Sequence, residues 1–229
     1  MCGRFDQHTL PYRYAGDIDA ILRSAPEEPP PRYNVAPRTQ AWVGRMARDG
    51  TREVVPLLWG LVPYRADDPT KSARPINARS ESVATKPMFR KLIEMHRCVI
   101  PVDGFYEWRA TASGKQPYYI RLESGEPMLL AGLWDRWQRD GVTQIESFTI
   151  LTTDASPEIA RLHDRMPALI APADLNRWLD VRGADAATAR AMLQPSEARL
   201  TVYPVSRRVN AARNEGPELI EPAPAISET

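Results

Sequence analysis

The chain has 229 residues, 43% of them hydrophobic, and its 30 Lys and Arg residues balance 29 Asp and Glu residues to a formal net charge of +1. This balance excludes a strongly basic surface over the whole molecule, so any nucleic-acid contact must use a local patch. Two cysteines and the lack of an apolar run near ~20 residues exclude a disulfide-rich scaffold and a helical membrane span, and they predict a soluble, cytoplasmic protein.

The first quarter of the chain is predicted to contain a helix, a loop and a hairpin. Residues 17–23 have the pattern of a short amphipathic helix. Residues 25–32 are rich in proline, which predicts a loop that is too short to separate two domains. Residues 40–46 and 51–59 are predicted strands of one hairpin, because the turn signal Asp49-Gly50 lies between them.

The middle of the chain is predicted to be rich in strands. Residues 61–76 are polar and irregular, which indicates a surface loop, whereas residues 86–96 suit a helix. Residues 97–102 are apolar and rich in β-branched side chains, as expected of a buried strand. Further strands are predicted at residues 105–109, 117–122, 127–134 and 146–153, with glycine-containing turns between them.

The last part of the chain is predicted to contain two helices and one strand. The helices cover residues 173–179 and 184–193, and Pro172 is favourable at the start of the first. The strand covers residues 201–205, and the proline-rich stretch from residue 217 to the end is predicted to be disordered.

Strands in the middle of the chain with helices on both sides predict the α+β class. We expect a single domain with a mostly antiparallel β-sheet or barrel-like core, flanked by short helices. This domain is expected to span residues 1–221, and residues 222–229 are expected to form a disordered tail.

Common cofactor and metal motifs do not occur in the sequence. No C-x-x-C or H-x-x-x-H pair suggests a zinc site, and no P-loop, dinucleotide-binding glycine motif or G-x-S-x-G elbow is present. The sequence therefore predicts neither a metal site nor a small-molecule cofactor.

Cys2 is the most informative single residue. Removal of Met1 would place an α-amino group and a thiol on the same residue, and such a 1,2-aminothiol reacts with an aldehyde in two steps. The amine first forms an imine, and the sulfur then closes a five-membered thiazolidine ring. In model peptides these two groups titrate near ~8 and ~8.5, so the reactive forms of both coexist near neutral pH. An internal cysteine lacks this chemistry.

Seven short segments combine polar or aromatic residues with proline and glycine. They are CGRF (2–5), RYNVAP (32–37), WGLVP (59–63), INARSE (76–81), GFYEW (104–108), LHDRMP (162–167) and PVS (204–206). Their order and spacing resemble the SOS-response-associated peptidase family, the abasic-site processing proteins. The resemblance extends over nearly the whole chain.

The resemblance implies a monomeric enzyme that binds single-stranded DNA with abasic sites and does not associate with membranes. The N-terminal cysteine of the family captures the ring-opened deoxyribose aldehyde as a thiazolidine DNA–protein crosslink. Removal of Met1, by the chain itself or by an aminopeptidase, is the step that gives the family the word peptidase, and abasic-site lyase activity proceeds through the imine.

Four residues are the predicted catalytic group. Cys2 supplies the amine and the thiol. Glu107 is expected to be partly desolvated beside Trp108 and can accept or donate a proton. His163 suits a proton shuttle, because histidine titrates near neutral pH. Asn77 can hold the Cys2 backbone or a sugar hydroxyl without titrating.

Six residues are the predicted DNA-binding group. Three arginines offer planar guanidinium groups for phosphates, and three aromatic residues offer faces for base stacking: Arg4, Arg79, Arg165, Tyr64, Phe89 and Trp108. Each arginine could instead form an internal ion pair, and each aromatic side chain could lie in the core. The chain departs from the family after the segment that ends at Pro63, where relatives often carry tryptophan and this chain has Tyr64. A tyrosine ring can still stack on a base, but a role as the side chain that separates neighbouring bases of the strand is in doubt here.

Three alternatives are compared with this function. A protease that acts on other proteins is the least favoured, because a cysteine that becomes N-terminal through its own cleavage suits a single event better than turnover. An N-terminal-nucleophile hydrolase, in particular a glutamine amidotransferase, also begins Met-Cys-Gly, but its chemistry does not need Glu107 or His163. A non-enzymatic single-strand DNA-binding module would bind intact and abasic strands equally and would form no covalent product.

Overall fold

Two β-sheets carry most of the chain, of which the computed structural model describes residues 2–23, 29–112, 114–139, 141 and 143–225. The strands are β1 (Phe5–Gln7), β2 (Ile21–Leu22), β3 (Arg32–Val35), β4 (Gln40–Met46), β5 (Arg52–Trp59), β6 (Asn77–Arg79), β7 (Arg97–Val102), β8 (Gly104–Thr111), β9 (Gly114–Leu122), β10 (Met128–Arg139), β11 (Thr143–Asp154), β12 (Arg165–Pro167) and β13 (Leu200–Pro204). The helices are α1 (Pro11–Asp17), α2 (Leu92–Met95), α3 (Pro157–Ala160), α4 (Leu175–Leu179) and α5 (Ala186–Ala191), with 3-10 turns η1 (Pro172–Asp174), η2 (Arg207–Asn210) and η3 (Pro217–Leu219).

The larger sheet closes on itself as a barrel. Its strands follow the order β11-β10-β7-β4-β5, with antiparallel neighbours throughout. The parallel pairing of β11 with β5, where Phe148 faces Trp59, joins the two ends and removes the open edges. The short strands β12 and β6 extend the sheet from β11, and β2 extends it from β5.

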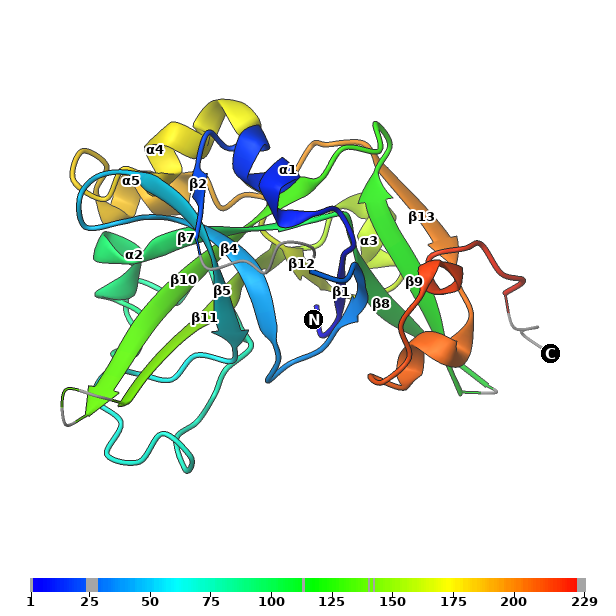
Figure 1. Cartoon of the computed structure of the whole chain (residues 1–229). Coiled ribbons are helices and arrows are strands. Elements are labelled where there is room, and N and C mark those ends of the chain that lie inside the picture. The colour runs from blue at the N-terminus through cyan, green and yellow to red at the C-terminus, as the bar shows by residue number, and fades with distance from the viewer. Residues whose placement is uncertain (1, 24–28, 113, 140, 142, 226–229) are drawn as a thin grey trace.

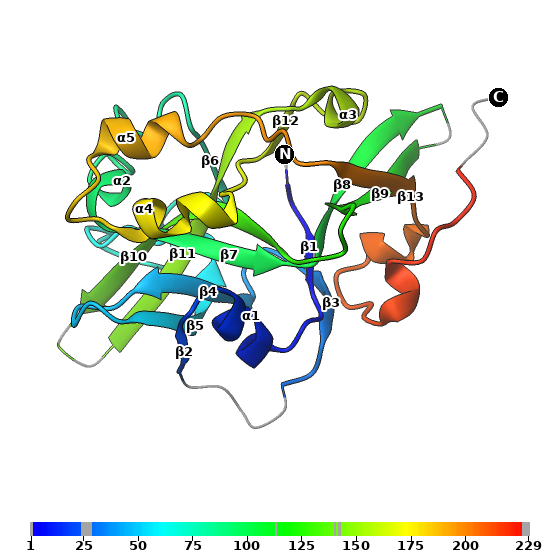
Figure 2. The same cartoon turned by 90° about the horizontal axis from the view of Figure 1, so that it is seen from above.

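The smaller sheet stands beside the barrel and carries the N-terminus. Its order is β13-β9-β8-β1-β3, and β1 lies on the side of this sheet that faces the barrel in both views of the molecule (Figures 1 and 2). Buried side chains from both sheets form one apolar core that includes Phe5, Trp59 and Phe105. Helices α2, α4 and α5 cover the barrel on the side away from β8 and β9 (Figure 2). No helix among the described residues has the length and apolar character to cross a membrane.

The fold confirms the predicted α+β class and most predicted strands. The hairpin at Asp49-Gly50 joins β4 to β5, with Gly50 at a φ of +88°, a conformation that favours glycine. Strands β7, β8, β9, β10, β11 and β13 occupy their predicted positions, several of them longer than expected.

The helix predictions were less accurate. The first helix is α1 (Pro11–Asp17) and not residues 17–23, because Pro11 favours a helix start and Asp19 adopts a positive φ of 50°, which ends it. The predicted helix at 86–96 shrinks to α2, although turns precede it in which the Arg90 N–H bonds the Lys86 carbonyl and the Ile93 N–H bonds the Phe89 carbonyl. The predicted helix at 184–193 is likewise shorter, as α5.

The C-terminal stretch is more ordered than predicted. From residue 217 the chain forms η3, and the buried side chain of Leu219 packs with Tyr106 and Val209, so disorder was a wrong prediction for this part. Met1, residues 25–28 of the predicted proline-rich loop and residues 226–229 of the predicted tail lie outside the described residues.

A buried carboxylate anchors β1. Asp6 accepts a hydrogen bond from the Tyr119 hydroxyl at 2.6 Å, and its two oxygens lie 2.9 Å from His8 Nδ1. Burial raises the pKa of Asp6 to about 6, although His8 opposes this shift. The hydrogen bond from His8 to Asp6 raises the pKa of His8. Both folded-state groups therefore hold a proton more tightly than they do in the unfolded chain.

We expect this anchor to weaken as the pH rises. The stability it contributes is complete below pH ~4, the range of an unfolded Asp, and falls as the pH passes through about 6 and then through the raised pKa of His8. We place the loss in the free energy of unfolding on the order of 1–3 kcal/mol, and Asp6→Asn should make that free energy less dependent on pH. Urea unfolding of both proteins from pH 4.5 to 7.5 measures it. Parallel curves for the two proteins would contradict the assignment.

Candidate active site

The Cys2 backbone is held where β1 enters the space between the sheets. Asn77 Nδ2 donates a hydrogen bond to the Cys2 carbonyl at 2.8 Å, and Asn77 starts β6, which pairs with β11. The Cys2 side chain is fully buried, and its thiol lies 3.7 Å from the Arg4 carbonyl. The Cys2 backbone is thus held by a residue of the barrel, whereas Phe5, three residues further on, pairs with Phe105 of β8 in the smaller sheet.

The environment of Cys2 keeps its sulfur protonated. Burial raises the pKa of the Cys2 thiol strongly, and the negative charge of Glu107 raises it further. Glu107 lies in β8, opposite Tyr118 of β9, and is buried as the sequence predicts. The thiol is therefore neutral at physiological pH until a base accepts its proton.

A cavity of about 430 Å³ opens beside Gly3 and gathers several of the predicted residues. We call it the cysteine cavity; it is lined by Gly3, Arg4, Glu107, Trp108, Lys115, His163 and Asn210. The lining comes from the two residues before β1, from β8 and β9, from the segment after α3 and from η2, so residues more than 200 positions apart meet here. Trp108 is oriented by its Nε1–H, which donates to Asn210 Oδ1 at 2.7 Å.

His163 lies on the segment between α3 and β12, with one nitrogen fixed. Its Nδ1 accepts a hydrogen bond from the Arg165 backbone N–H at 3.0 Å and lies 2.7 Å from Asp164 Oδ1. In the neutral ring the Arg165 contact places the proton on Nε2, whereas a donation from Nδ1 to Asp164 requires a protonated Nδ1, which cannot accept the hydrogen bond from Arg165. Because the backbone of Arg165 engages Nδ1, Nε2 is the His163 nitrogen that can act in the cysteine cavity.

Arg4 and the C-terminal segment are tied together by the buried Asn34. Arg4 Nη1 donates to Asn34 Oδ1 at 2.7 Å and to the Val209 carbonyl at 3.0 Å. Asn34 Nδ2 in turn lies within hydrogen-bonding distance of the carbonyls of Val209, Ala211 and Asn214. Arg4 Nε has no hydrogen-bond partner in the described part of the chain. The guanidinium is therefore held in place through Nη1, and its buried Nε–H is still unused.

A larger cavity of about 1020 Å³ lies on the other side of Asn77. We call it the loop cavity; among its lining residues are Tyr64, Arg65, Arg74, Asn77, Arg79, Lys86 and Phe89. Tyr64 is 46% exposed, whereas Phe89 is only 6% exposed and packs mostly in the core. The loop of residues 61–76 supplies one wall, and the cations give this cavity a local positive charge that the balanced composition conceals.

Arg165 is the predicted DNA-binding residue that lines neither of these cavities. Its guanidinium is buried and bonds Glu81 Oε1 at 2.7 Å and Asp154 Oδ1 at 2.6 Å. The pair lowers the pKa of Glu81. A phosphate would have to compete with two carboxylates for this guanidinium. Of the two interpretations of Arg165, a phosphate contact or an internal ion pair, the structure shows the ion pair.

Sequence reasoning missed several residues that the fold adds. Lys115 and Asn210 enter the cysteine cavity, and Arg65, Arg74 and Lys86 enter the loop cavity. Asn34 was visible within the RYNVAP segment, but no sequence signal marked the others. One group of potential metal ligands, Asp6, His8 and Asp103, occurs in the described part of the chain, and tyrosine hydroxyls already bond both of its carboxylates.

Comparison with known proteins identifies the relatives of this chain. The family model described as SOS response associated peptidase (SRAP) matches residues 1–212. Abasic site processing protein YoqW of Bacillus subtilis is 37% identical over 96% of this chain and 99% of its own length. Abasic site processing protein YedK of Escherichia coli is 33% identical over 97% of this chain and 100% of its own length. Abasic site processing protein HMCES of Gallus gallus is 30% identical over 84% of this chain and 66% of its own length.

Solved structures share the fold. A crystal structure of a Bacteroides thetaiotaomicron protein has a TM-score of 0.86 at 23% identity, and the match covers 97% of this chain and 100% of that one. A phage-related protein from Bordetella bronchiseptica has a TM-score of 0.72 at 30% identity, covering 90% of this chain and 95% of that one.

Proposed function

The chain belongs to the SOS response associated peptidase family, and from this premise we propose that it captures abasic sites of single-stranded DNA on Cys2. After removal of Met1, the Cys2 amine and thiol react with the ring-opened deoxyribose aldehyde. The product is a thiazolidine that joins protein and DNA covalently. The observation that carries this proposal is the fixed position of Cys2 between Asn77 and Glu107, next to a cavity that also contains His163.

The reaction needs a defined order of proton transfers. The neutral α-amine adds to the aldehyde carbon, the hydroxyl of this adduct takes up a proton, and water leaves as the imine forms. The thiol then adds to the imine carbon and passes its proton to the nitrogen. One molecule of water is released in total. Because the resting thiol of Cys2 is protonated, the amine is the first nucleophile and the sulfur reacts second.

Two residues divide the proton transfers in this proposal. Glu107 acts on the Cys2 side of the cavity, where its charge already affects the thiol. His163 delivers a proton at the departing hydroxyl, with Nε2 available because Nδ1 is engaged by the backbone. Asn77 is a positioning residue, since it bonds the Cys2 carbonyl and leaves the amine and thiol free to react. Lyase activity would follow from the imine instead: a base removes a C2′ proton, the C3′–O bond breaks as the 3′ phosphate leaves, and water then hydrolyses the imine to release the protein.

Intact-mass measurement tests the proposal directly. The Met1-free protein is incubated with a single-stranded oligonucleotide that carries one abasic site. The expected product has the summed mass of protein and oligonucleotide minus one water. No mass increase would overturn this proposal, and DNA binding without an adduct would then favour the non-enzymatic module. Ammonia release from glutamine by the same protein would favour the amidotransferase alternative.

We further propose that the loop cavity and Arg4 guide the DNA backbone. Arg79 is exposed at the end of β6, two residues from Asn77, and Tyr64 offers an exposed ring in the same cavity. Guanidinium groups suit phosphates, and stacking on aromatic rings tolerates any base. A strand in this cavity would place its sugar beside Asn77 and Cys2.

Arg79→Ala is expected to weaken binding of single-stranded DNA and to flatten its salt dependence. Loss of one phosphate contact should lower the magnitude of the log–log salt slope by about 0.7–1. Fluorescence anisotropy from 50 to 300 mM salt measures the slope. Arg199→Ala is the matched control, because Arg199 is exposed on the far edge of the smaller sheet. If the salt slopes of Arg79→Ala and Arg199→Ala were equal, Arg79 would not contact a phosphate.

A further inference from the structure

A third cavity, of about 540 Å³, lies apart from the proposed reaction site. It is formed by the β4–β5 turn, α2, the middle of β10 and the segment after α4, and none of its lining residues lines the cysteine cavity or the loop cavity. We call it the His96 pocket. Its volume falls within the ~300–1,000 Å³ typical of small-molecule sites.

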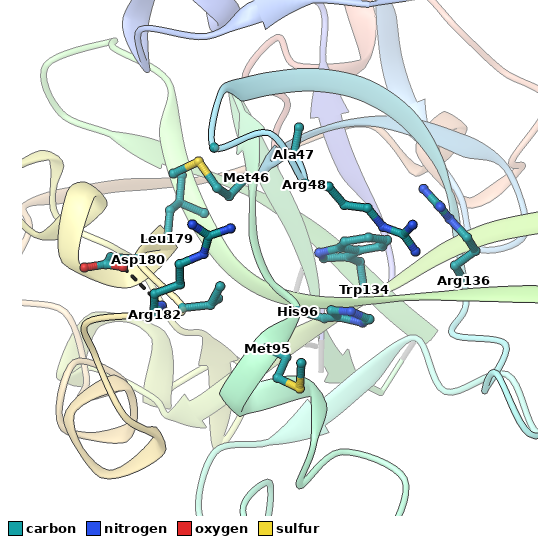
Figure 3. Close-up of a pocket in the computed structure, with 12 residues that line it drawn as sticks. Met46, Ala47, Arg48, Met95, His96, Trp134, Arg136, Leu179, Asp180 and Arg182 are labelled. Atoms are coloured by element: carbon teal, nitrogen blue, oxygen red, sulfur yellow. Dashed lines mark hydrogen bonds between the residues drawn. The ribbon is translucent and has the colours of Figure 1, made fainter.

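Two stacked rings form one wall of the His96 pocket. The rings of His96 and Trp134 lie 4.5 Å apart at 19°, one above the other (Figure 3). His96 Nδ1 is buried without a hydrogen-bond partner among the described residues, and the nearest carboxylate oxygen, on Asp135, is 3.8 Å away. The neighbouring Met95 is 63% exposed. The wall is thus aromatic and apolar, with an exposed Met95 side chain and a buried His96 nitrogen whose hydrogen-bonding capacity is unused.

Cations flank this wall on two sides. Figure 3 shows Arg182 on the side of Leu179 and Arg48 on the opposite side of the stacked rings. The Arg48 side chain makes no hydrogen bond or ion pair within the described part of the chain, and both arginines are exposed. Asp180, the acid in the lining, accepts hydrogen bonds from the backbone N–H groups of Arg182 and Gly183.

The local field around His96 is positive. Burial lowers the pKa of His96, and the charges of Arg45, Arg136 and Arg48 lower it further. Of these, Arg45 and Arg136 are paired with Glu146, whereas Arg48 is not. A histidine that remains neutral at physiological pH offers a flat ring for stacking, and the unpaired guanidinium beside it attracts an anion.

We propose that the His96 pocket binds a nucleotide, with the base against His96 and Met95 and with phosphates reaching Arg48 and Arg182. Arginines on opposite sides of one aromatic wall match a nucleoside that carries phosphates on both its 5′ and 3′ oxygens. Two sources offer this chemistry: a free nucleotide, and a nucleotide within a bound DNA strand. The proposal does not depend on the reaction at Cys2, since no residue is shared.

Calorimetric titration of the full chain tests the pocket. The probes are deoxyadenosine 3′,5′-bisphosphate, deoxyadenosine 5′-monophosphate and deoxyadenosine, and affinity should fall in that order. The double variant R48Q/R182Q should bind the bisphosphate about tenfold or more weakly, as expected for loss of two charge-assisted contacts. The matched control is R190Q/R199Q, which removes the same charge at exposed arginines outside this pocket and should bind like the unmodified protein.

A strand-binding arm separates the two sources. If the nucleotide belongs to bound DNA, R48Q/R182Q also weakens binding of an undamaged single strand, and the bisphosphate competes with that strand. If the ligand is a free nucleotide, strand affinity is unchanged and the bisphosphate binds the DNA-saturated protein. The proposal is overturned if the unmodified protein fails to bind the bisphosphate below millimolar concentration, or if both double variants, shown to be folded by their melting temperatures, lose binding equally.

Discussion

Replacing Cys2 with alanine is expected to abolish the denaturation-resistant adduct between the Met1-free protein and abasic single-stranded DNA. The thiazolidine needs the sulfur, and the other cysteine, Cys98, is buried in β7 within the core. Denaturing electrophoresis with a uracil-containing strand pretreated with uracil glycosylase measures the adduct. The effect should be complete, since no second aminothiol exists in the chain.

Cys2→Ser supplies the control for this experiment. It keeps the α-amine and the approximate size of the side chain, so an imine still forms and borohydride traps it as a stable amine. The unreduced sample should show no adduct. An unreduced adduct of undiminished yield in Cys2→Ala would remove Cys2 from the mechanism. A serine variant without a trappable imine would show that the amine is not the first nucleophile.

Glu107→Gln and His163→Ala are expected to slow adduct formation by about 10²–10⁴, the usual cost of losing a general acid–base. Glutamine keeps the shape of the buried Glu107 side chain, and His163 lies on a surface segment, so both variants should keep a melting temperature near that of the unmodified protein. Single-turnover kinetics from pH 5.5 to 8.5 measure the rates. Unchanged rates in both variants would leave Cys2 to act without either residue.

The pH profile separates Glu107 from a purely structural role. The negative charge of Glu107 is one of the causes that raise the pKa of Cys2, so Glu107→Gln should lower that pKa. Ring closure by the sulfur should then become faster at lower pH than in the unmodified protein, while imine formation stays slow. Glu107→Asp serves as the conservative variant and should recover part of the imine rate. If Glu107→Gln instead lowered the rate of adduct formation by the same factor at every pH, the substitution would have displaced Cys2 and Glu107 would have a structural role.

The β-rich core was predictable because its strands carry a local signal. Residues 97–102 are apolar and β-branched, and Asp49-Gly50 marks a turn whatever surrounds it. Helices were harder, since α2 and α5 are short and depend on packing against the barrel more than on their own sequence. Residues 21–22 form a strand because Leu22 pairs with Val54 of β5. This pairing is not visible in the local sequence pattern.

Part of the candidate site was likewise visible in the sequence. Cys2, Asn77, Glu107 and His163 stand in distinctive segments, and the fold brings Cys2 into contact with Asn77. Lys115 enters the cysteine cavity through the pairing of β9 with β8, and Asn210 enters through a turn that follows β13. The environment of Arg165 depends on two carboxylates, one 84 positions away, so sequence spacing gave no sign of its ion pairs.

The hydrogen bonds of Arg4 and Asn34 have a consequence for the order of folding. Arg4 Nη1 and Asn34 Nδ2 both bond the Val209 carbonyl, which lies 205 positions after Arg4 in the sequence. The wall of the cysteine cavity at Arg4 therefore reaches its final form only after the segment that contains η2 has folded back against β3. Truncation before Val209 would remove the carbonyl that holds the Arg4 guanidinium in place.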